Sequence, residues 1–349
     1  MQLSSSNSAA DGRRNGASGG GVATKNRTSA KRNVALRRLG GLVACAALLA
    51  QSQLAAALLP PAETGDLYVS SFGGDEIAVY SGSGDYLRSF SAPGLDGPRG
   101  IVFVPDGRMF VASQLTNEVF VFSAAEDWES SFGHTELDGP TGMALGDDGL
   151  LYVSSFGNDQ VVVFHLSGTF DRTFTDSEID GPNCIAFSAA RDAFVANGAN
   201  AQVVRFGTGD PLGFTGGGLS SPMGVALDTE GMIHVGGGAS HDIVRFDTDG
   251  GFLGEITHPD LTGPQGLAFD DRGHLFASSF FQDHVVEFDS DGSHVQTFGQ
   301  GPAEGDLDVP RSVAFRPVPE PASGLQLLAG AAALWARRRR QGRQDNAAG

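Results

Sequence analysis

The sequence predicts an all-β protein whose body is a ring of six four-stranded units, a six-bladed β-propeller. Three observations lead to this fold. Fifty glycines and 24 phenylalanines in 349 residues indicate many short strands joined by tight turns. A Gly-Pro motif recurs every 40 to 46 residues, and an alternating apolar strand recurs in step with it. Four strands repeated at about 40–45 residues are typical of propeller blades.

The Gly-Pro motif opens each unit. It reads GPRG, GPTG, GPNC, SPMG, GPQG and VPRS, with prolines at positions 98, 140, 182, 222, 264 and 310. A first strand such as residues 100–105 follows it. The chain then turns at dipeptides in which glycine accepts the positive φ of a tight hairpin, namely Asp106-Gly107, Asp148-Gly149, Glu230-Gly231 and Arg272-Gly273.

The rest of each unit holds three more strands. Segments such as MFVAS and NEVFVF alternate with a period of two residues, as half-buried strands do. An aliphatic residue recurs in the third strand at positions 77, 119, 161, 203, 243 and 285. The fourth strand ends at an apolar residue: Phe90, Phe132, Phe174, Phe214, Ile256 and Phe298.

The two ends of the repeat region predict how the ring closes. It begins with DLYVSSF, a second strand, and finishes with a first strand over 311–317. The C-terminal strand should therefore complete the N-terminal blade, which leaves no open sheet edge. Residues 60–317 show no helical periodicity.

The repeat resembles the six-bladed propellers of the NHL type over residues 64–317. The resembling residues are the Gly-Pro-x-Gly motif and the Asp-x-Val-x-x-Phe strand, as in Asp159 to Phe164. The resemblance implies the propeller fold and says little about activity, because one fold hosts many functions.

Charge is distributed unevenly along the chain. The two ends, 1–57 and 318–349, hold 13 of the 23 basic residues and 3 of the 41 acidic ones, so 58–317 keeps 10 arginines and 38 acids. A net charge of −28 on this segment argues against nucleic acid and against anionic membrane surfaces.

The N-terminal segment, 1–57, predicts a disordered basic lead followed by a secretory signal peptide. Two arginines, 37 and 38, precede an apolar run over 40–50, and three alanines at 55–57 offer a cleavage site. Cys45 lies too early in the apolar run for a lipoprotein leader. Removal of this leader would leave Cys184 as the single thiol of the mature protein.

The C-terminal stretch over 318–340 combines a Pro-Glu-Pro turn, a mainly apolar segment over 322–336 and four arginines. A bilayer span needs about 20 residues, so this segment is short for a permanent anchor. It resembles the PEP-CTERM sorting signal of Gram-negative bacteria, which implies an exosortase-type enzyme as partner. The resembling residues are Pro319, Glu320, Pro321, Arg337, Arg338, Arg339 and Arg340. A polar tail, 341–349, follows.

Two rings of repeat positions are expected to meet around one mouth of the central channel. The first is the position after the proline: Arg99, Thr141, Asn183, Met223, Gln265 and Arg311. The second ends the second strand: Ser71, Ser113, Ser155, Asn197, Gly237 and Ser279, followed by Phe72, Phe156 and Phe280 in three repeats. Cations, hydroxyls, amides and aromatic rings together suit a carbohydrate or peptide. The alternative is that these residues satisfy backbone groups of their own loops.

Catalysis is the rival hypothesis. NHL propellers resemble gluconolactonases and streptogramin B lyases, and Asn183 matches an asparagine that such lactonases use for a metal. Asn183 and Asn197 are therefore weak candidates for calcium ligands, but neither ring holds a carboxylate, and calcium sites take six to eight oxygens. No cofactor is expected.

The sequence thus predicts an exported envelope or matrix protein that works as a binding module for exopolysaccharide or an envelope protein. A propeller hydrolase or lyase and a spacer without a ligand remain alternatives.

Overall fold

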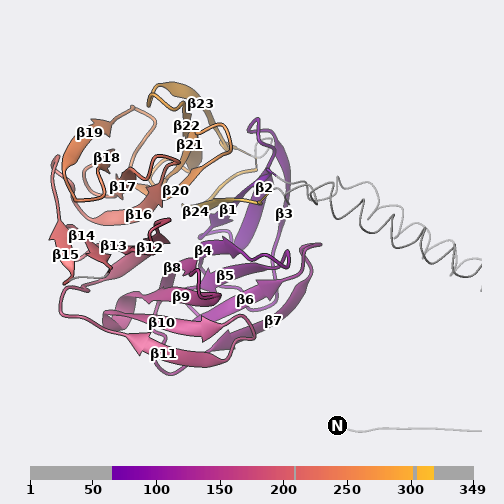
Figure 1. Ribbon diagram of the computed structural model, residues 1–349. Coiled ribbons are helices and arrows are strands. Elements are labelled where there is room, and N and C mark those ends of the chain that lie inside the picture. The colour runs from indigo at the N-terminus through magenta and orange to yellow at the C-terminus, as the bar shows by residue number, and fades with distance from the viewer. Residues whose placement is uncertain (1–64, 208–209, 302–304, 318–349) are drawn as a thin grey trace, which may run out of the picture. The chain divides into compact units, whose positions relative to one another are not determined.

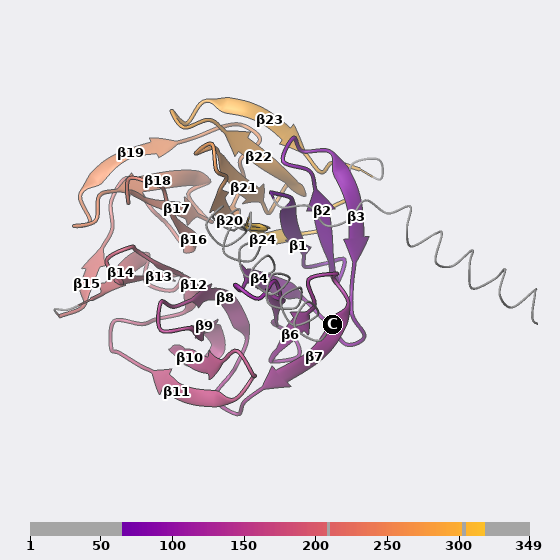
Figure 2. The same cartoon turned by 45° about the vertical axis from the view of Figure 1, so that its right-hand side comes forward.

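The computed structural model describes residues 65–207, 210–301 and 305–317. These residues form six four-stranded antiparallel sheets arranged as a ring (Figures 1 and 2). The predicted all-β six-bladed propeller is confirmed. The predicted leader (1–57) and sorting tail (318–340) lie outside the described residues.

The innermost strand of every blade begins at the proline of the repeat motif. Proline has no N–H to donate, so it is suited to the first position of a strand. These strands adjoin one another around the axis: β4 (Pro98–Phe103), β8 (Pro140–Leu145), β12 (Pro182–Phe187), β16 (Pro222–Leu227), β20 (Pro264–Phe269) and β24 (Pro310–Phe315).

The second strand of each blade runs antiparallel to the first and returns to the same mouth of the ring. These strands are almost wholly buried: β1 (Leu67–Ser71), β5 (Met109–Ser113), β9 (Leu150–Ser155), β13 (Ala193–Asn197), β17 (Ile233–Gly237) and β21 (Leu275–Ser279).

The third and fourth strands complete the blades outward. The third strands are β2 (Glu76–Tyr80), β6 (Glu118–Phe122), β10 (Gln160–His165), β14 (Gln202–Phe206), β18 (Asp242–Phe246) and β22 (His284–Phe288). The outermost strands are β3 (Tyr86–Phe90), β7 (Trp128–Gly133), β11 (Phe170–Phe174), β15 (Leu212–Phe214), β19 (Phe252–Ile256) and β23 (His294–Phe298). Among the described residues the one helical element is a 3₁₀ turn, η1 (Phe156–Asn158).

The ring closes as the sequence predicted. Strand β24 pairs with β1, with Leu67 opposite Phe315 and Val69 opposite Val313, so the first blade has the order β24-β1-β2-β3. Figure 1 shows β24, in yellow, beside β1, in indigo. The hydrophobic core consists of six clusters, each formed by two neighbouring blades. The blades therefore depend on one another for burial of their apolar faces.

Candidate functional site

The six residues that follow the repeat prolines come together at the mouth of the channel. They line a central cavity of about 60 Å³: Arg99, Thr141, Asn183, Met223, Gln265 and Arg311.

Small residues next along the inner strands allow this close approach. A Cβ atom on Gly224 would lie 2.2 Å from the carbonyl oxygen of Gln265, and one on Gly266 would lie 2.5 Å from that of Arg311. Both distances are far below van der Waals contact, so a side chain at either position would push neighbouring blades apart. Cys184 and Ser312 occupy the same repeat position in two other blades.

Two arginines of adjacent blades share one acceptor in this cavity. The Nη2 atom of Arg99 donates to Gln265 Oε1 at 3.1 Å, and Nη1 of Arg311 donates to the same oxygen at 2.7 Å. Arg99 Nη1 also donates to Gln114 Oε1 at 3.2 Å. A single amide oxygen thus bridges two guanidinium groups.

Aromatic rings hold the second guanidinium in place. The Cζ atom of Arg311 lies 4.6 Å from the ring centroid of Phe72 and 4.3 Å from that of Phe280. Both distances are within the range of cation–π attraction. The rings therefore position the guanidinium and leave its N–H groups able to donate within the guanidinium plane. The Nε atom of Arg311 is buried and has no hydrogen-bond partner among the described residues.

The charge of this pair is uncompensated within the described chain. Neither arginine has a carboxylate within ion-pair distance among those residues. Burial lowers the pKa of Arg99 to about 9, and the charge of Arg311 acts on it in the same direction. Burial also lowers the pKa of Arg311 to about 10. Both groups stay cationic at neutral pH, so the cavity favours an anion.

The second predicted ring has a different environment. The hydroxyls of Ser71, Ser113, Ser155 and Ser279 are buried and bond to the backbone of the loops that lead into the inner strands. Ser113 Oγ, for example, donates to the carbonyl of Asp96 at 2.9 Å and accepts from its N–H at 3.0 Å. Asn197 donates to the carbonyl of Glu178. These contacts match the alternative that the ring satisfies loop backbone.

Two members of the first ring also bond to backbone. Thr141 Oγ1 donates to the carbonyl of Pro182 at 2.9 Å, and Asn183 Nδ2 donates to that of Pro222 at 3.3 Å. Each therefore ties its inner strand to the next blade. Of the two weak calcium candidates, Asn183 lines the cavity and Asn197 is buried at the end of β13; the described residues that line the cavity include no carboxylate.

Exposed apolar side chains lie in the loops that follow the second strands. Leu115 is 61% exposed, Phe156 is 41% exposed and Phe281 is 62% exposed. A Cβ on a motif glycine would contact each of these side chains: Gly97 and Gly263, in the same blades as Leu115 and Phe281, and Gly181, in the blade after Phe156. The three side chains therefore belong to the same mouth. We call these three residues the apolar rim.

A second feature of these loops was missed by the sequence interpretation. Before each third strand a residue has left-handed backbone, and in five blades its side chain accepts the N–H that precedes the proline of the next blade. The accepting residues are Asp75, Asn117, Asp159, His241 and Asp283, with bond lengths of 2.7 to 2.9 Å. The sixth position is Ala201, which has no such side chain. The sequence did carry a signal for these bonds. Four of the acceptors lie 22 residues before the motif glycine that they bind, and Asp283 lies 26 residues before Val309.

Cys184 also lines the cavity. Burial raises the pKa of its thiol, whose Sγ faces the carbonyls of Ile185 and Val225 at 3.9 Å. It is a protonated thiol at neutral pH and a poor nucleophile.

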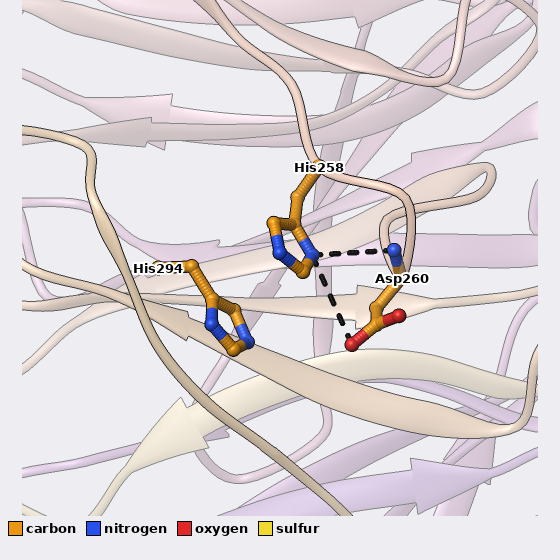
Figure 3. Close-up of side chains that lie close together, drawn as sticks. All are labelled: His258, Asp260 and His294. Carbon is orange, nitrogen blue, oxygen red and sulfur yellow. Dashed lines mark hydrogen bonds and ion pairs between the residues drawn. The ribbon is translucent and has the colours of Figure 1, made fainter.

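Among the described residues, two clusters of metal-ligating side chains lie outside the central cavity. One is His258, Asp260 and His294, shown in Figure 3. The two imidazole rings stack with centroids 4.0 Å apart and planes 2° apart. Nitrogen lone pairs lie in the ring plane, so one ion cannot lie in both planes as the rings stand. In the other cluster, Asp270 and Glu287 already bind Arg272.

Comparison with known proteins places the fold. The chain matches no protein-family model and no curated protein. It is similar to streptogramin B lyase, with 15% identity, a TM-score of 0.57 and coverage of 73% of this chain and 88% of that one. Virginiamycin B lyase from Staphylococcus aureus has 14% identity and a TM-score of 0.58, with coverage of 74% of this chain and 87% of that one. A chain of the nidogen/laminin complex has 14% identity and a TM-score of 0.62, with coverage of 72% of this chain and 98% of that one. At such identities the similarity shows the six-bladed propeller fold and nothing finer.

Among the described residues no helix is long and apolar enough to cross a membrane.

Proposed function

We propose that this protein is an exported propeller that works as a binding module, with the mouth of its channel as the ligand surface. The observation that carries the proposal is the pair of guanidinium groups, Arg99 and Arg311, which share the oxygen of Gln265 and have no ion-pair partner in the described chain. Both arginines are half-buried, and because cations withdrawn from water are costly without a counter-charge, this arrangement favours a ligand that brings one.

The surroundings of the pair fit binding. The apolar rim of Leu115, Phe156 and Phe281 offers exposed hydrophobic surface beside a small cavity that holds a few polar groups. Ligand sites commonly combine an apolar wall with a few fixed polar groups. The serines and the asparagine of the second ring bond to backbone, as do Thr141 and Asn183 of the first ring. The proposed ligand surface therefore consists of the arginine pair, Gln265 and the apolar rim.

The lyase alternative draws on the structural neighbours. One of them is a catalytically inactive variant of virginiamycin B lyase from Staphylococcus aureus in which alanine replaces a histidine. Here the described residues that line the cavity include neither histidine nor a carboxylate. His241 lies in the loops of the mouth, but its Nδ1 accepts the N–H of Gly263 at 2.9 Å. Binding needs no general base, and so it is the function that this set of side chains supports better.

Export is the second part of the proposal, and it rests on the leader and on the Pro-Glu-Pro tail. Strand β24 ends at Phe315, so a sorting enzyme of the exosortase type could cut beyond Pro317 without removing any strand of the ring. Secretion to the envelope or the extracellular matrix would bring the mouth into contact with envelope proteins and exopolysaccharide.

A ligand screen tests the binding function. The protein is exposed to arrays of peptides and of glycans, and hits are measured by calorimetry. We expect hits that are lost in Arg99→Gln and Arg311→Gln and kept in Arg191→Gln. The control arginine pairs with Asp147 at the far end of β12, and its substitution removes the same charge. Hits that survive both mouth variants would place the ligand surface elsewhere.

A further inference from the structure

We infer that the mouth binds a single terminal carboxylate carried on a neutral or positively charged body, as at the C-terminus of a peptide. This inference rests on the proposed function, because it names the ligand class of the same surface. Four features of the mouth support it: the donors in the cavity, the cavity's size, the charge around it and the apolar rim.

The donors suit a carboxylate. Gln265 Oε1 now accepts from both guanidinium groups, and Nε of Arg311 is buried without a partner among the described residues. Two cations therefore share one neutral oxygen as acceptor. An anion would be a stronger acceptor for both of them. A carboxylate brings two oxygens and a full charge, and its hydrogen bonds to guanidinium are about twice as strong as neutral ones.

The size of the cavity selects an end group. Its volume of about 60 Å³ is enough for a few water molecules. Pockets that enclose whole drug-sized ligands measure about 300–1,000 Å³. A sugar ring therefore cannot enter, whereas a carboxylate at the end of a chain can. The rest of the ligand must lie on the surrounding loops.

Those loops are acidic. Asp96, Asp138 and Asp308 precede the motif glycine or valine in three blades, are exposed, and have no ion-pair partner in the part of the chain that the structure describes. The whole segment 58–317 has a net charge of −28. A polyanion such as a polyuronate would be repelled over a Debye length of about 8 Å at physiological salt. A ligand with one leading carboxylate is attracted to the arginine pair; a neutral body avoids the repulsion from the acidic loops, and a cationic body is also attracted to them.

The apolar rim gives the last residue of such a peptide a place. Leu115 and Phe281 are each more than half exposed in the loops of the mouth. A bulky apolar side chain beside the terminal carboxylate would bury this surface while the carboxylate reaches the arginine pair.

Four probes test the inference. They are N-acetyl-Ala-Lys-Phe with a free carboxyl group, the same peptide as C-terminal amide, N-acetyl-Ala-Glu-Phe with a free carboxyl group, and trigalacturonate. Affinities for the full-length protein are measured by calorimetry. We expect the lysine peptide acid to bind at least about tenfold tighter than its amide and tighter than the glutamate peptide.

Variants link the binding to the proposed atoms. Arg99→Gln, Arg311→Gln and Gln265→Glu should abolish the preference for acid over amide, the last because its own carboxylate occupies the donors. Arg311→Lys keeps the charge and guards against misfolding, and should retain part of the preference. Arg191→Gln should keep all of it.

Each result has a consequence. Equal binding of acid and amide, or tighter binding of trigalacturonate than of the peptides, would overturn the carboxylate inference and leave the mouth as a ligand surface. Failure of all four probes, together with unchanged thermal stability of Gln265→Glu, would overturn both the inference and the proposed function.

Discussion

Replacing Gln265 by glutamate is the most direct test of the charge in the channel. The two side chains have the same length and shape, so packing in the mouth should not change. The substitution places a carboxylate where an amide oxygen now accepts from Arg99 at 3.1 Å and from Arg311 at 2.7 Å. If the two cations lack a counter-charge, the glutamate variant should be more stable than the natural protein.

The size of the effect follows from opposing terms. A hydrogen bond to a charged group contributes about 1.5–3 kcal/mol, against about 0.5–1.5 kcal/mol for a neutral one, and here the donors are already charged. Gln265 is 8% exposed, so its carboxylate loses hydration, which costs several kcal/mol before pairing. Relief of the repulsion between the two arginines adds to the gain. We expect a net stabilisation of about 1–2 kcal/mol, or roughly 2–8 °C in Tm for a ring of this size.

The pH dependence of unfolding is a second test of whether Gln265→Glu stabilises the protein. Two adjacent guanidinium groups should hold the pKa of the new carboxyl below the ordinary value for glutamate, about 4.3. A depressed folded-state pKa means that the added stability is present above that value and is lost as the pH falls through the folded pKa. Thermal unfolding followed by circular dichroism at neutral and acid pH measures both.

A matched control keeps this test specific. Gln160 is also buried, but its Nε2 donates to Glu136, so Gln160→Glu brings two like charges together and should destabilise the protein. A lower unfolding temperature of Gln265→Glu than of the natural protein at neutral pH, or a stability gain that does not diminish in acid, would contradict an uncompensated charge in the channel.

Three further substitutions test the architecture, each by urea or thermal unfolding. Burial raises the pKa of Glu126, but hydrogen bonds, above all from Arg88, outweigh this effect and hold the pKa below the usual range. Glu126→Gln should therefore lower the free energy of unfolding by about 3 kcal/mol above about pH 5. The difference between the two proteins should shrink as acid protonates the native carboxylate. Ala201→Asp should add about 1 kcal/mol, because it suits left-handed backbone and can accept the N–H of Ser221; an unchanged midpoint would contradict this. Gly224→Ala should cost about 3 kcal/mol or more, since its Cβ would meet a carbonyl oxygen at 2.2 Å, and a neutral result would mean that the inner strands can separate.

The strands could be predicted closely because the repeat is written six times. Each inner strand begins at a repeat proline, slightly before the expected 100–105 in the second blade, where β4 covers Pro98–Phe103. The hairpin glycines expected at 107, 149, 231 and 273 all have positive φ. Ring closure by β24 was predictable because the repeat region begins with a second strand and ends with a first strand.

The contacts that decide the site were less accessible. Phe72 and Phe280 come from neighbouring blades that lie at opposite ends of the chain, and only folding places both on the guanidinium of Arg311. The serines looked equally suited to a ligand or to backbone, since a hydroxyl serves both, and only the structure shows where each one points. His258 and His294 likewise meet through the fold and not through any local spacing.

The asymmetry of the mouth separates what builds the ring from what it can recognise. The proline is present in all six repeats and the residue before it is glycine in four; these positions form the loops and inner strands that each blade needs. The position after the proline differs in almost every blade, and it lines the cavity. Its polar, charged members are not spread evenly: Gln265, Arg311 and Arg99 lie on β20, β24 and β4, which adjoin one another, whereas Thr141 and Asn183 bond to backbone. A ligand held by this surface should therefore sit off the axis, over three blades, and contact the other three weakly.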